Sequence, residues 1–229
     1  MQKRPCVAVV LAAGNGKRMG GPVAKQFLEV NGKPLIFYAL DTMETSKVID
    51  QVVLVVPEES IEYVKKEILE KYSLNKVVRV VAGGKERYDS VRNALQFIEK
   101  DTYIFIHDGA RALVSEEILK RGLEQVELCS ACVAAVPVKD TIKRVDQDGF
   151  AVETPERSTL WTVQTPQVFA GEIIKEAYEA LPETANVTDD AGVVEWYGNA
   201  KVKMYLGDYT NLKVTTPEDM ILMKSFLKK

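Results

Sequence analysis

The sequence contains very little histidine and cysteine. His107 is the only histidine among 229 residues, so a site built on several imidazoles is excluded and a Ser/His/Asp triad would have one possible base. The three cysteines, Cys6, Cys129 and Cys132, are an odd number in or beside apolar segments, which argues against a disulfide framework. Because no second cysteine pair exists, we interpret Cys129 and Cys132 as small core residues rather than as a redox pair or half a zinc site.

The chain also lacks an excess of positive charge and any long apolar run. Its net charge is −3, from 30 basic and 33 acidic residues, so no global basic field attracts nucleic acid or an anionic membrane. No apolar run approaches the roughly 20 residues of a membrane-spanning helix, and the amino terminus leads into a strand-like segment rather than a signal sequence. We expect a cytoplasmic protein without nucleic-acid or membrane partners, in which positive charge acts locally.

Strand-like apolar runs alternate with segments of helical period. The runs lie at residues 7–11, 52–56, 77–81, 103–106 and 132–136, and the helical segments between them at 34–44, 59–72, 89–99 and 115–127. This alternation predicts an α/β fold with a mostly parallel sheet covered on both faces. Ligands of such sheets bind at the carboxyl ends of the strands. We expect one domain over residues 1–229, with further helices near 171–180, after 188 and after 216, and an edge strand at 202–206.

Residues 138–164 have a different pattern. Alternating apolar positions at 141–145 and 151–152 flank an Asp-Gln-Asp-Gly turn at 146–149, and residues 160–163 follow. This predicts a β-hairpin arm, inserted in the domain. Because a long two-stranded ribbon cannot bury both faces alone, we expect the arm to pack on a second copy of the chain and form a homodimer. The alternative is an arm that folds back over its own sheet.

A glycine-containing loop follows the first apolar run. Residues 12–19, Ala-Ala-Gly-Asn-Gly-Lys-Arg-Met, fit neither common phosphate-binding loop. A dinucleotide fingerprint needs a glycine where Met19 stands, and a Walker loop needs Ser or Thr where Arg18 stands. Small residues let backbone N–H groups approach an anion, and Arg18 and Lys25 add positive charge. The loop is typical of a triphosphate cradle, with a plain surface turn as the alternative.

Nine short motifs are spaced along nearly the whole chain. They are Leu11-Ala12-Ala13-Gly14-x-Gly16-x-Arg18-Met19, Lys25-Gln26-Phe27, Gly83-Gly84-x-x-Arg87-x-x-Ser90-Val91, His107-Asp108-x-Ala110-Arg111, Pro137-Val138-Lys139-Asp140-Thr141, Arg157-x-x-Leu160-Trp161, Gln164-Thr165-Pro166-Gln167, Thr188-Asp189-Asp190-Ala191 and Asn211-x-Lys213-Val214-Thr215-x-Pro217-Glu218-Asp219. Together they resemble the 2-C-methyl-D-erythritol 4-phosphate cytidylyltransferases of the non-mevalonate isoprenoid pathway. The resemblance implies a Rossmann-like nucleotidyltransferase fold, a three-layer sandwich with an arm for dimerisation.

The resemblance also implies a reaction. The phosphate of 2-C-methyl-D-erythritol 4-phosphate would attack the α-phosphate of CTP, and pyrophosphate would leave with Mg²⁺ as the cofactor. Such transfers depend on positioning and on stabilising negative charge more than on a general base. This fits a chain with one histidine, which we expect to pack or to orient a loop rather than to transfer a proton. The alternatives are transfer to ribitol 5-phosphate and nucleotide binding without catalysis.

Site residues follow from the same resemblance. The implied catalytic residues are Arg18, Lys25, Arg157 and Lys213. The implied nucleotide-binding residues are Leu11, Ala12, Ala13, Gly14, Gly16, Gly83, Gly84, Arg87, Ser90 and Asp108. The implied binding residues for the second substrate are Arg111, Thr141, Arg157, Thr188, Asp189 and Lys213. Asp108 is implied near the metal, but the sequence does not identify direct ligands. The chain departs from the family at Lys85, Gly109 and Ala112, none of which removes an implied charged group.

Overall fold

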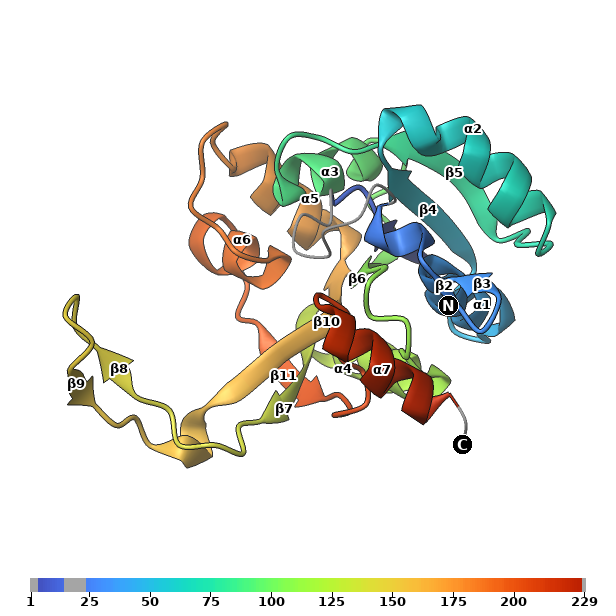
Figure 1. Ribbon diagram of the computed structural model, residues 1–229. Helices are drawn as coiled ribbons and strands as arrows, with labels where there is room; N and C mark the ends of the chain where they lie inside the picture. The colour runs from blue at the N-terminus through green and yellow to red at the C-terminus, as the bar shows by residue number, and fades with distance from the viewer. Residues whose placement is uncertain (1–3, 15–23, 228–229) are drawn as a thin grey trace.

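The computed structural model describes residues 4–14 and 24–227. Its centre is a seven-stranded sheet, which can be followed in Figure 1. The strand order is β11-β7-β10-β6-β1-β4-β5. The strands of this sheet are β1 (Cys6–Leu11), β4 (Gln51–Val56), β5 (Val77–Ala82), β6 (Tyr103–Asp108), β7 (Ala131–Pro137), β10 (Trp161–Ala170) and β11 (Lys203–Leu206). Two small sheets pair β2 (Glu29–Val30) with β3 (Lys33–Pro34), and β8 (Arg144–Val145) with β9 (Ala151–Glu153).

Helices connect these strands. The α-helices are α1 (Leu35–Thr45), α2 (Ile61–Val64), α3 (Arg87–Leu95), α4 (Glu116–Cys129), α5 (Gly171–Ala180), α6 (Asp190–Tyr197) and α7 (Pro217–Phe226). The shorter elements are the 3-10 turns η2 (Lys25–Phe27), η3 (Glu58–Ser60) and η5 (Arg157–Thr159), and the π-helix η4 (Lys65–Glu70), which continues α2. Within residues 4–14 and 24–227, no helix has the length and apolar character needed to cross a membrane.

The helices cover both faces of the sheet, as the sequence predicted. Successive side chains of a strand point to opposite faces. Along β1, Ala8 and Val10 belong to a buried cluster that also contains side chains of α1, α2 and α4. Val7 and Val9 belong to a second cluster, with side chains of α3, α5 and α6. The near-continuous apolar runs of the sequence are therefore explained by strands that are buried on two sides.

The sequence pattern missed one central strand. Residues 160–163 were expected to end the arm, but Trp161–Ala170 form a single strand, β10, whose buried second half lies between β6 and β7. β10 runs antiparallel to both neighbours, whereas the other neighbouring strands pair in parallel. Pro166 has no N–H for a ladder, so the polar run Gln164-Thr165-Pro166-Gln167 resembles a loop. The register of β10 against β7 shifts at this run, between Val163 and Gln167.

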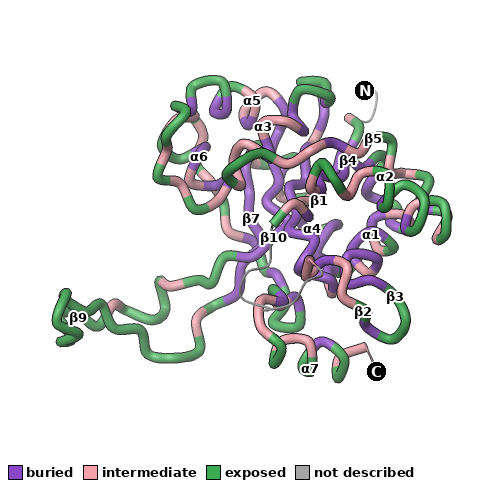
Figure 2. Tube along the Cα trace, turned by 45° about the horizontal axis from the view of Figure 1, so that its top comes forward, coloured by how far each residue is buried: buried purple, intermediate pink, exposed green. Residues whose placement is uncertain are grey.

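The arm, residues 138–164, extends away from the body of the molecule (Figures 1 and 2). Its tip is the β8–β9 hairpin, and Trp161–Val163 pair with the end of β7 near its base. The arm is almost entirely exposed in the single chain, so the alternative in which it folds back over its own sheet is not what the structure shows. The expected packing on a second copy stays a prediction.

Helix starts follow the sequence signals. Thr216 caps α7 in a capping box with Asp219, and Pro217 occupies the first turn. Asp189 caps α6 by accepting a hydrogen bond from the N–H of Gly192. Asp189 is itself an implied substrate-binding residue, and Thr216 lies three positions after another, Lys213. The two caps therefore fix where the helices next to these residues begin.

Candidate active site

A cavity of about 290 Å³ opens at the carboxyl edge of the sheet. β1 and β6 end side by side there, because Leu11 of β1 is in register with Asp108 of β6. The described residues that line this cavity, called the pocket below, are Leu11, Ala12, Ala13, Gly14, Lys25, Gln26, Gly84, Lys85, Glu86, Arg87, Ser90, Asp108, Ala110 and Lys213. The edge predicted from the strand ends therefore contains a pocket.

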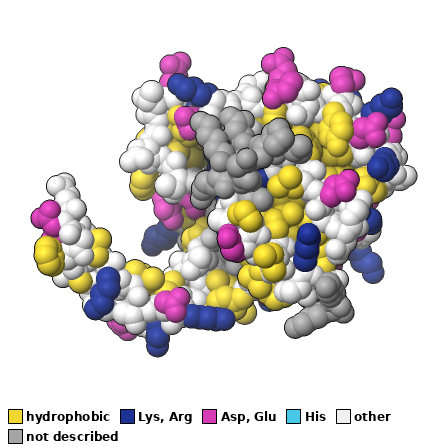
Figure 3. Space-filling view, viewed as in Figure 1, with side chains coloured by type: hydrophobic (Ala, Val, Ile, Leu, Met, Phe, Trp, Pro, Cys, Tyr) yellow, Lys and Arg dark blue, Asp and Glu magenta, His cyan; other side chains and the backbone are white. Residues whose placement is uncertain are grey.

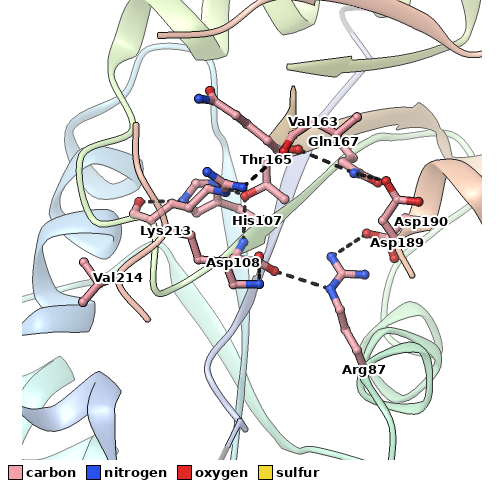
Figure 4. Close-up of polar contacts among 12 residues, drawn as sticks. Arg87, His107, Asp108, Val163, Thr165, Gln167, Asp189, Asp190, Lys213 and Val214 are labelled. Atoms are coloured by element: carbon pink, nitrogen blue, oxygen red, sulfur yellow. Dashed lines mark hydrogen bonds and ion pairs between the residues drawn. The ribbon is translucent and has the colours of Figure 1, made fainter. Parts of the chain in front are cut away.

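Asp108 lies between two cations at the base of the pocket (Figure 4). Lys213 Nζ is 2.7 Å from Asp108 Oδ2, and Arg87 Nε is 3.4 Å from Asp108 Oδ1. Burial alone would raise the pKa of Asp108, but the charges of Arg87 and Lys213 outweigh it and hold that pKa well below its ordinary value. Asp108 is therefore ionised at neutral pH and fixes the positions of two cationic side chains.

Arg87 is shared between two carboxylates. Its Nη2 lies 2.7 Å from Oδ2 of Asp190, the first residue of α6, while its Nε approaches Asp108. Burial would lower the pKa of Arg87, but Asp190 and Asp108 raise it above its ordinary value. The guanidinium is thus a permanent charge held at two points.

His107 supports Asp108 from inside the sheet. Its Nε2 is 3.0 Å from the carbonyl oxygen of Arg111, which can only accept, so Nε2 carries the proton. Burial lowers the pKa of His107 to about 4, so the ring is neutral at pH 7 and Nδ1 accepts from the hydroxyl of Thr165 at 3.0 Å. The same Thr165 oxygen accepts from the backbone N–H of Asp108 at 3.0 Å. The expectation that this histidine orients a loop is confirmed by these contacts.

Two glycines after β5 bring the start of α3 close to the end of β1. A Cβ on Gly83 would lie 2.3 Å from the Cβ of Ala13, and one on Gly84 would lie 2.2 Å from the Cβ of Asp89. The N–H of Gly83 donates to Val56 O, and the N–H of Gly84 donates to Ser90 Oγ at 3.0 Å. Both N–H groups are therefore used inside the protein, and the close approach explains why glycine stands at both positions.

Comparison with known proteins places the chain among relatives. Residues 6–229 match the sequence model of the 2-C-methyl-D-erythritol 4-phosphate cytidylyltransferase family. The chain belongs to this family. A relative of the same name from Lachnospira eligens is 50% identical over 224 residues, which are 96% of this chain and 98% of the relative. Another, from Clostridium perfringens strain SM101, is 47% identical over 97% of this chain and 98% of the relative.

Solved structures agree with the cytidylyltransferase assignment. The 4-diphosphocytidyl-2C-methyl-D-erythritol synthase of Anaerococcus prevotii superimposes with a TM-score of 0.86 at 33% identity, over 99% of this chain and 97% of that one. The 2-C-methyl-D-erythritol 4-phosphate cytidylyltransferase of Thermus thermophilus superimposes with a TM-score of 0.77 at 26% identity, over 96% and 98%. The predicted fold class is therefore confirmed.

The pocket of this cytidylyltransferase brings together most of the predicted nucleotide-binding residues. It also contains two of the predicted catalytic residues, Lys25 and Lys213. The Nζ of Lys25 donates to Val214 O at 3.1 Å, next to Lys213 in the chain. Two predicted residues, Gly16 and Arg18, lie outside the described residues.

Other predicted residues are not in the pocket lining. Arg157 and Thr141 lie on the exposed arm, where Arg157 Nη1 donates to Lys139 O at 3.1 Å. Thr188 is exposed, and Asp189 uses one oxygen for the cap of α6 and the other to accept from Gln167 Nε2.

Arg111 connects two segments near the base of the arm. Its Nη1 donates to Asn211 O at 2.8 Å, and its Nη2 donates to Val163 O at 3.3 Å. Burial lowers the pKa of Arg111, although Asp108 partly offsets this effect. In the single chain, Arg111 therefore holds β10 and the segment before α7 together.

The pocket contains four lining residues that the sequence did not assign to it: Gln26, Lys85, Glu86 and Ala110. Gln26 is 2% exposed, and its Nε2 has no hydrogen-bond partner among the described residues. Its position inside the Lys25-Gln26-Phe27 motif was the available signal. Glu86 caps α3 in a capping box with Asp89, so its place at the pocket follows from the helix start.

Proposed function

We propose that this protein transfers CMP from CTP to 2-C-methyl-D-erythritol 4-phosphate, giving 4-diphosphocytidyl-2-C-methyl-D-erythritol and pyrophosphate. Family membership over residues 6–229 carries the proposal, and the cation-lined pocket at the carboxyl edge supports it. The same finding favours this reaction over transfer to ribitol 5-phosphate and over nucleotide binding without catalysis.

The reaction forms one P–O bond and breaks another. An oxygen of the substrate phosphate attacks the α-phosphorus of CTP, and the bond to the bridging oxygen breaks to release pyrophosphate. Negative charge grows on the transferred phosphoryl group, and fixed cations stabilise it. Lys25 and Arg87, which line the pocket, are proposed to contact the triphosphate, together with Arg18. No side chain needs to remove a proton, because the attacking phosphate is already an anion.

The residues present fit a Mg²⁺ ion that arrives with the triphosphate. Among the described residues, no three His, Cys, Asp or Glu side chains gather into a metal cluster. Mg²⁺ in phosphate-transfer sites is bound by one or two carboxylates together with substrate phosphates. Asp108, ionised in the pocket, is the proposed carboxylate. Such an ion, when bound, neutralises charge on the triphosphate.

The turn after β5 is proposed to recognise the base. Because both N–H groups of Gly83 and Gly84 bind within the protein, a carbonyl oxygen is the only polar group that either glycine has left for a ligand. Carbonyl oxygens accept from the amino group of cytosine and would oppose the carbonyl of uracil. We therefore expect CTP to bind more tightly than UTP, as isothermal titration with the two nucleotides would measure.

The arm is proposed to complete the active site of a partner in a homodimer. Its exposed apolar side chains are Ile142, Val145, Phe150, Val152, Trp161 and Val163 (Figure 3). Phe150 is 71% exposed in the single chain, and such a surface favours association. An arm that crosses to a partner would bring Thr141 and Arg157 to the partner's pocket, where Arg157 and Lys213 suit a phosphomonoester.

Sedimentation tests the dimer. Wild type should sediment as a dimer, and Phe150→Ser or deletion of residues 140–160 should shift it toward monomer. Leu128→Ser is the matched control, because Leu128 is 81% exposed on α4, outside the arm. A monomeric wild type would contradict the proposal.

Complementation tests the shared site. Arg157→Ala and Lys25→Ala chains are each expected to have little activity on their own, but mixed dimers would contain one intact site of two. Random reassortment of the chains should then restore about a quarter of wild-type activity. No restoration after verified subunit exchange would count against the shared site.

Pyrophosphate release tests the reaction. The protein is incubated with CTP and Mg²⁺ and with 2-C-methyl-D-erythritol 4-phosphate, ribitol 5-phosphate or no acceptor. Release with the first acceptor alone is the expected result. Release with ribitol 5-phosphate instead would support the alternative substrate. No pyrophosphate release under any of the three conditions would support a protein that binds the nucleotide without catalysis.

A further inference from the structure

Behind the pocket lies a buried polar pair that the reaction described above does not use. Asp190 is 0% exposed, and Tyr178 on α5 is 4% exposed. The hydroxyl of Tyr178 donates to Asp190 Oδ1 at 2.7 Å, and Asp190 Oδ2 meets Arg87 Nη2 at 2.7 Å. Asp190 thus bridges the core helix α5 and a cation of the pocket.

These contacts hold one guanidinium at two points (Figure 4). Arg87 is the first residue of α3, Asp190 is the first residue of α6, and Asp108 is the last residue of β6. Nε and Nη2 of Arg87 are occupied by the two carboxylates, while Nη1 makes no hydrogen bond with any residue that the structure describes. Because a guanidinium is planar, fixing two nitrogens also fixes the direction of the third.

Stability alone is a weak reason to bury this carboxylate. Taking a charge out of water is unfavourable, and buried ion pairs can often be replaced by apolar side chains without loss of stability. The ring of Tyr178 already packs in the apolar cluster shared with α3 and α6. Burial and the charge of Asp190 raise the pKa of Tyr178 well above its ordinary value, so its hydroxyl stays protonated and donates. What the hydroxyl adds is a fixed orientation of Asp190.

We propose that Asp190 and Tyr178 are positioning residues for Arg87. They hold its guanidinium so that Nε contacts Asp108 and Nη2 contacts Asp190. The remaining NH₂ group, Nη1, is then directed to the triphosphate of CTP. This inference rests on the proposed function, because it takes CTP as the ligand of the pocket. Neither residue touches the nucleotide itself, and each acts through Arg87.

The proposal predicts a change in affinity whose sign opposes simple electrostatics. Asp190→Asn keeps the size of the side chain and removes one negative charge near a site for an anion. If Asp190 acted only through its charge, the variant would bind CTP more tightly. If it positions Arg87, the variant loses a charge-assisted contact and binds CTP about tenfold more weakly.

Tyr178→Phe isolates the hydroxyl without changing any charge. It should weaken CTP binding about fivefold in isothermal titration with Mg²⁺ and raise the KM for CTP more than it lowers kcat. Tyr205→Phe is the matched control: Tyr205 is 5% exposed, and its hydroxyl donates to Pro166 O at 3.4 Å, outside the Arg87 contacts. CTP affinity should stay within about twofold of wild type in this control.

A double-mutant cycle tests whether Asp190 acts through Arg87. Arg87→Lys keeps the charge but cannot meet both carboxylates as a fork does. In the double variant with Asp190→Asn, the loss of affinity should not exceed that of the weaker-binding single variant. Effects that multiply would overturn the proposal. So would equal CTP affinity in wild type and Tyr178→Phe, whatever happens to the melting temperature.

Two readouts separate this inference from the proposed function. If wild type binds CTP and releases pyrophosphate while Tyr178→Phe and Asp190→Asn bind CTP as wild type does, only the positioning role is refuted. If wild type neither binds CTP nor releases pyrophosphate, the proposed function is refuted and the inference falls with it. Should Asp190→Asn fail to fold, Tyr178→Phe and its control decide the question.

Discussion

His107, the only histidine of the chain, makes the stability of this protein depend on pH between its ordinary pKa and its lowered folded-state pKa. Its pKa is lowered from 6.5 to about 4 by burial. In the unfolded chain, His107 therefore binds a proton near pH 6.5, whereas in the folded chain it binds one only near pH 4. The stabilisation is complete above pH 6.5 and is lost as pH falls from there toward 4. Asp108 has a depressed pKa, so its contribution is lost only at lower pH.

The size of the effect follows from the two pKa values. Between pH 7.5 and 5.0, the free energy of unfolding should fall by about 2 kcal/mol, with about one proton taken up on unfolding at pH 5. Urea unfolding at fixed protein concentration across this range measures the change. Because the chain has a single histidine, its imidazole signal in an NMR titration can be assigned without ambiguity.

His107→Gln is the control for this prediction. A glutamine amide can still donate to the carbonyl of Arg111, but it does not titrate. The variant should be less stable at pH 7.5 and should show a much flatter dependence between pH 7.5 and 5.0. Equal slopes in wild type and variant, or a folded-state histidine pKa near 6.5, would refute the reasoning.

Two further predictions concern the pocket. Lys25→Ala and Lys213→Ala should each lower turnover by about 10²-fold in the pyrophosphate assay, because each removes a fixed cation, and wild-type turnover would remove that lysine from the mechanism. Gly84→Ala should lower the free energy of unfolding by about 1–3 kcal/mol in urea, because its Cβ would lie 2.2 Å from Asp89 Cβ. Gly84→Ala should also weaken CTP binding, because Asp89 and Arg87 both lie in the first turn of α3. Unchanged stability and affinity would show that the turn can widen to accept the added Cβ.

Local patterns predicted the elements that form the pocket. The apolar runs became β1, β4, β5, β6 and β7. In β1, β4, β6 and β7 the apolar segment is nearly continuous because these strands are buried on two faces, whereas β5 lies at the edge of the sheet and is largely exposed. The helices predicted after 188 and after 216 were found there, and each begins at a capping residue, Asp189 or Thr216, which acts within one turn.

Local sequence patterns could not predict contacts between distant segments of the chain. Arg87 and Asp190 are 103 positions apart, and neither residue type nor spacing indicates that they meet. The second half of β10 was missed because a polar run with a proline is poor in strand signals, although its position between β6 and β7 buries it. Such residues are chosen by their neighbours in the fold rather than by their neighbours in sequence.

The charge of the pocket depends both on local sequence patterns and on contacts between distant segments. The chain as a whole is acidic, yet the described lining contains four cationic and two anionic side chains: Lys25, Lys85, Arg87, Lys213, Glu86 and Asp108. These cations come from separate segments, so composition could predict only that positive charge acts locally. Folding brings these cations together in one pocket, because the ends of β1 and β6 and the start of α3 meet at one edge of the sheet. Asp108 and Asp190 then keep Arg87 in place without removing its charge, and a triphosphate would meet a cation that is already oriented.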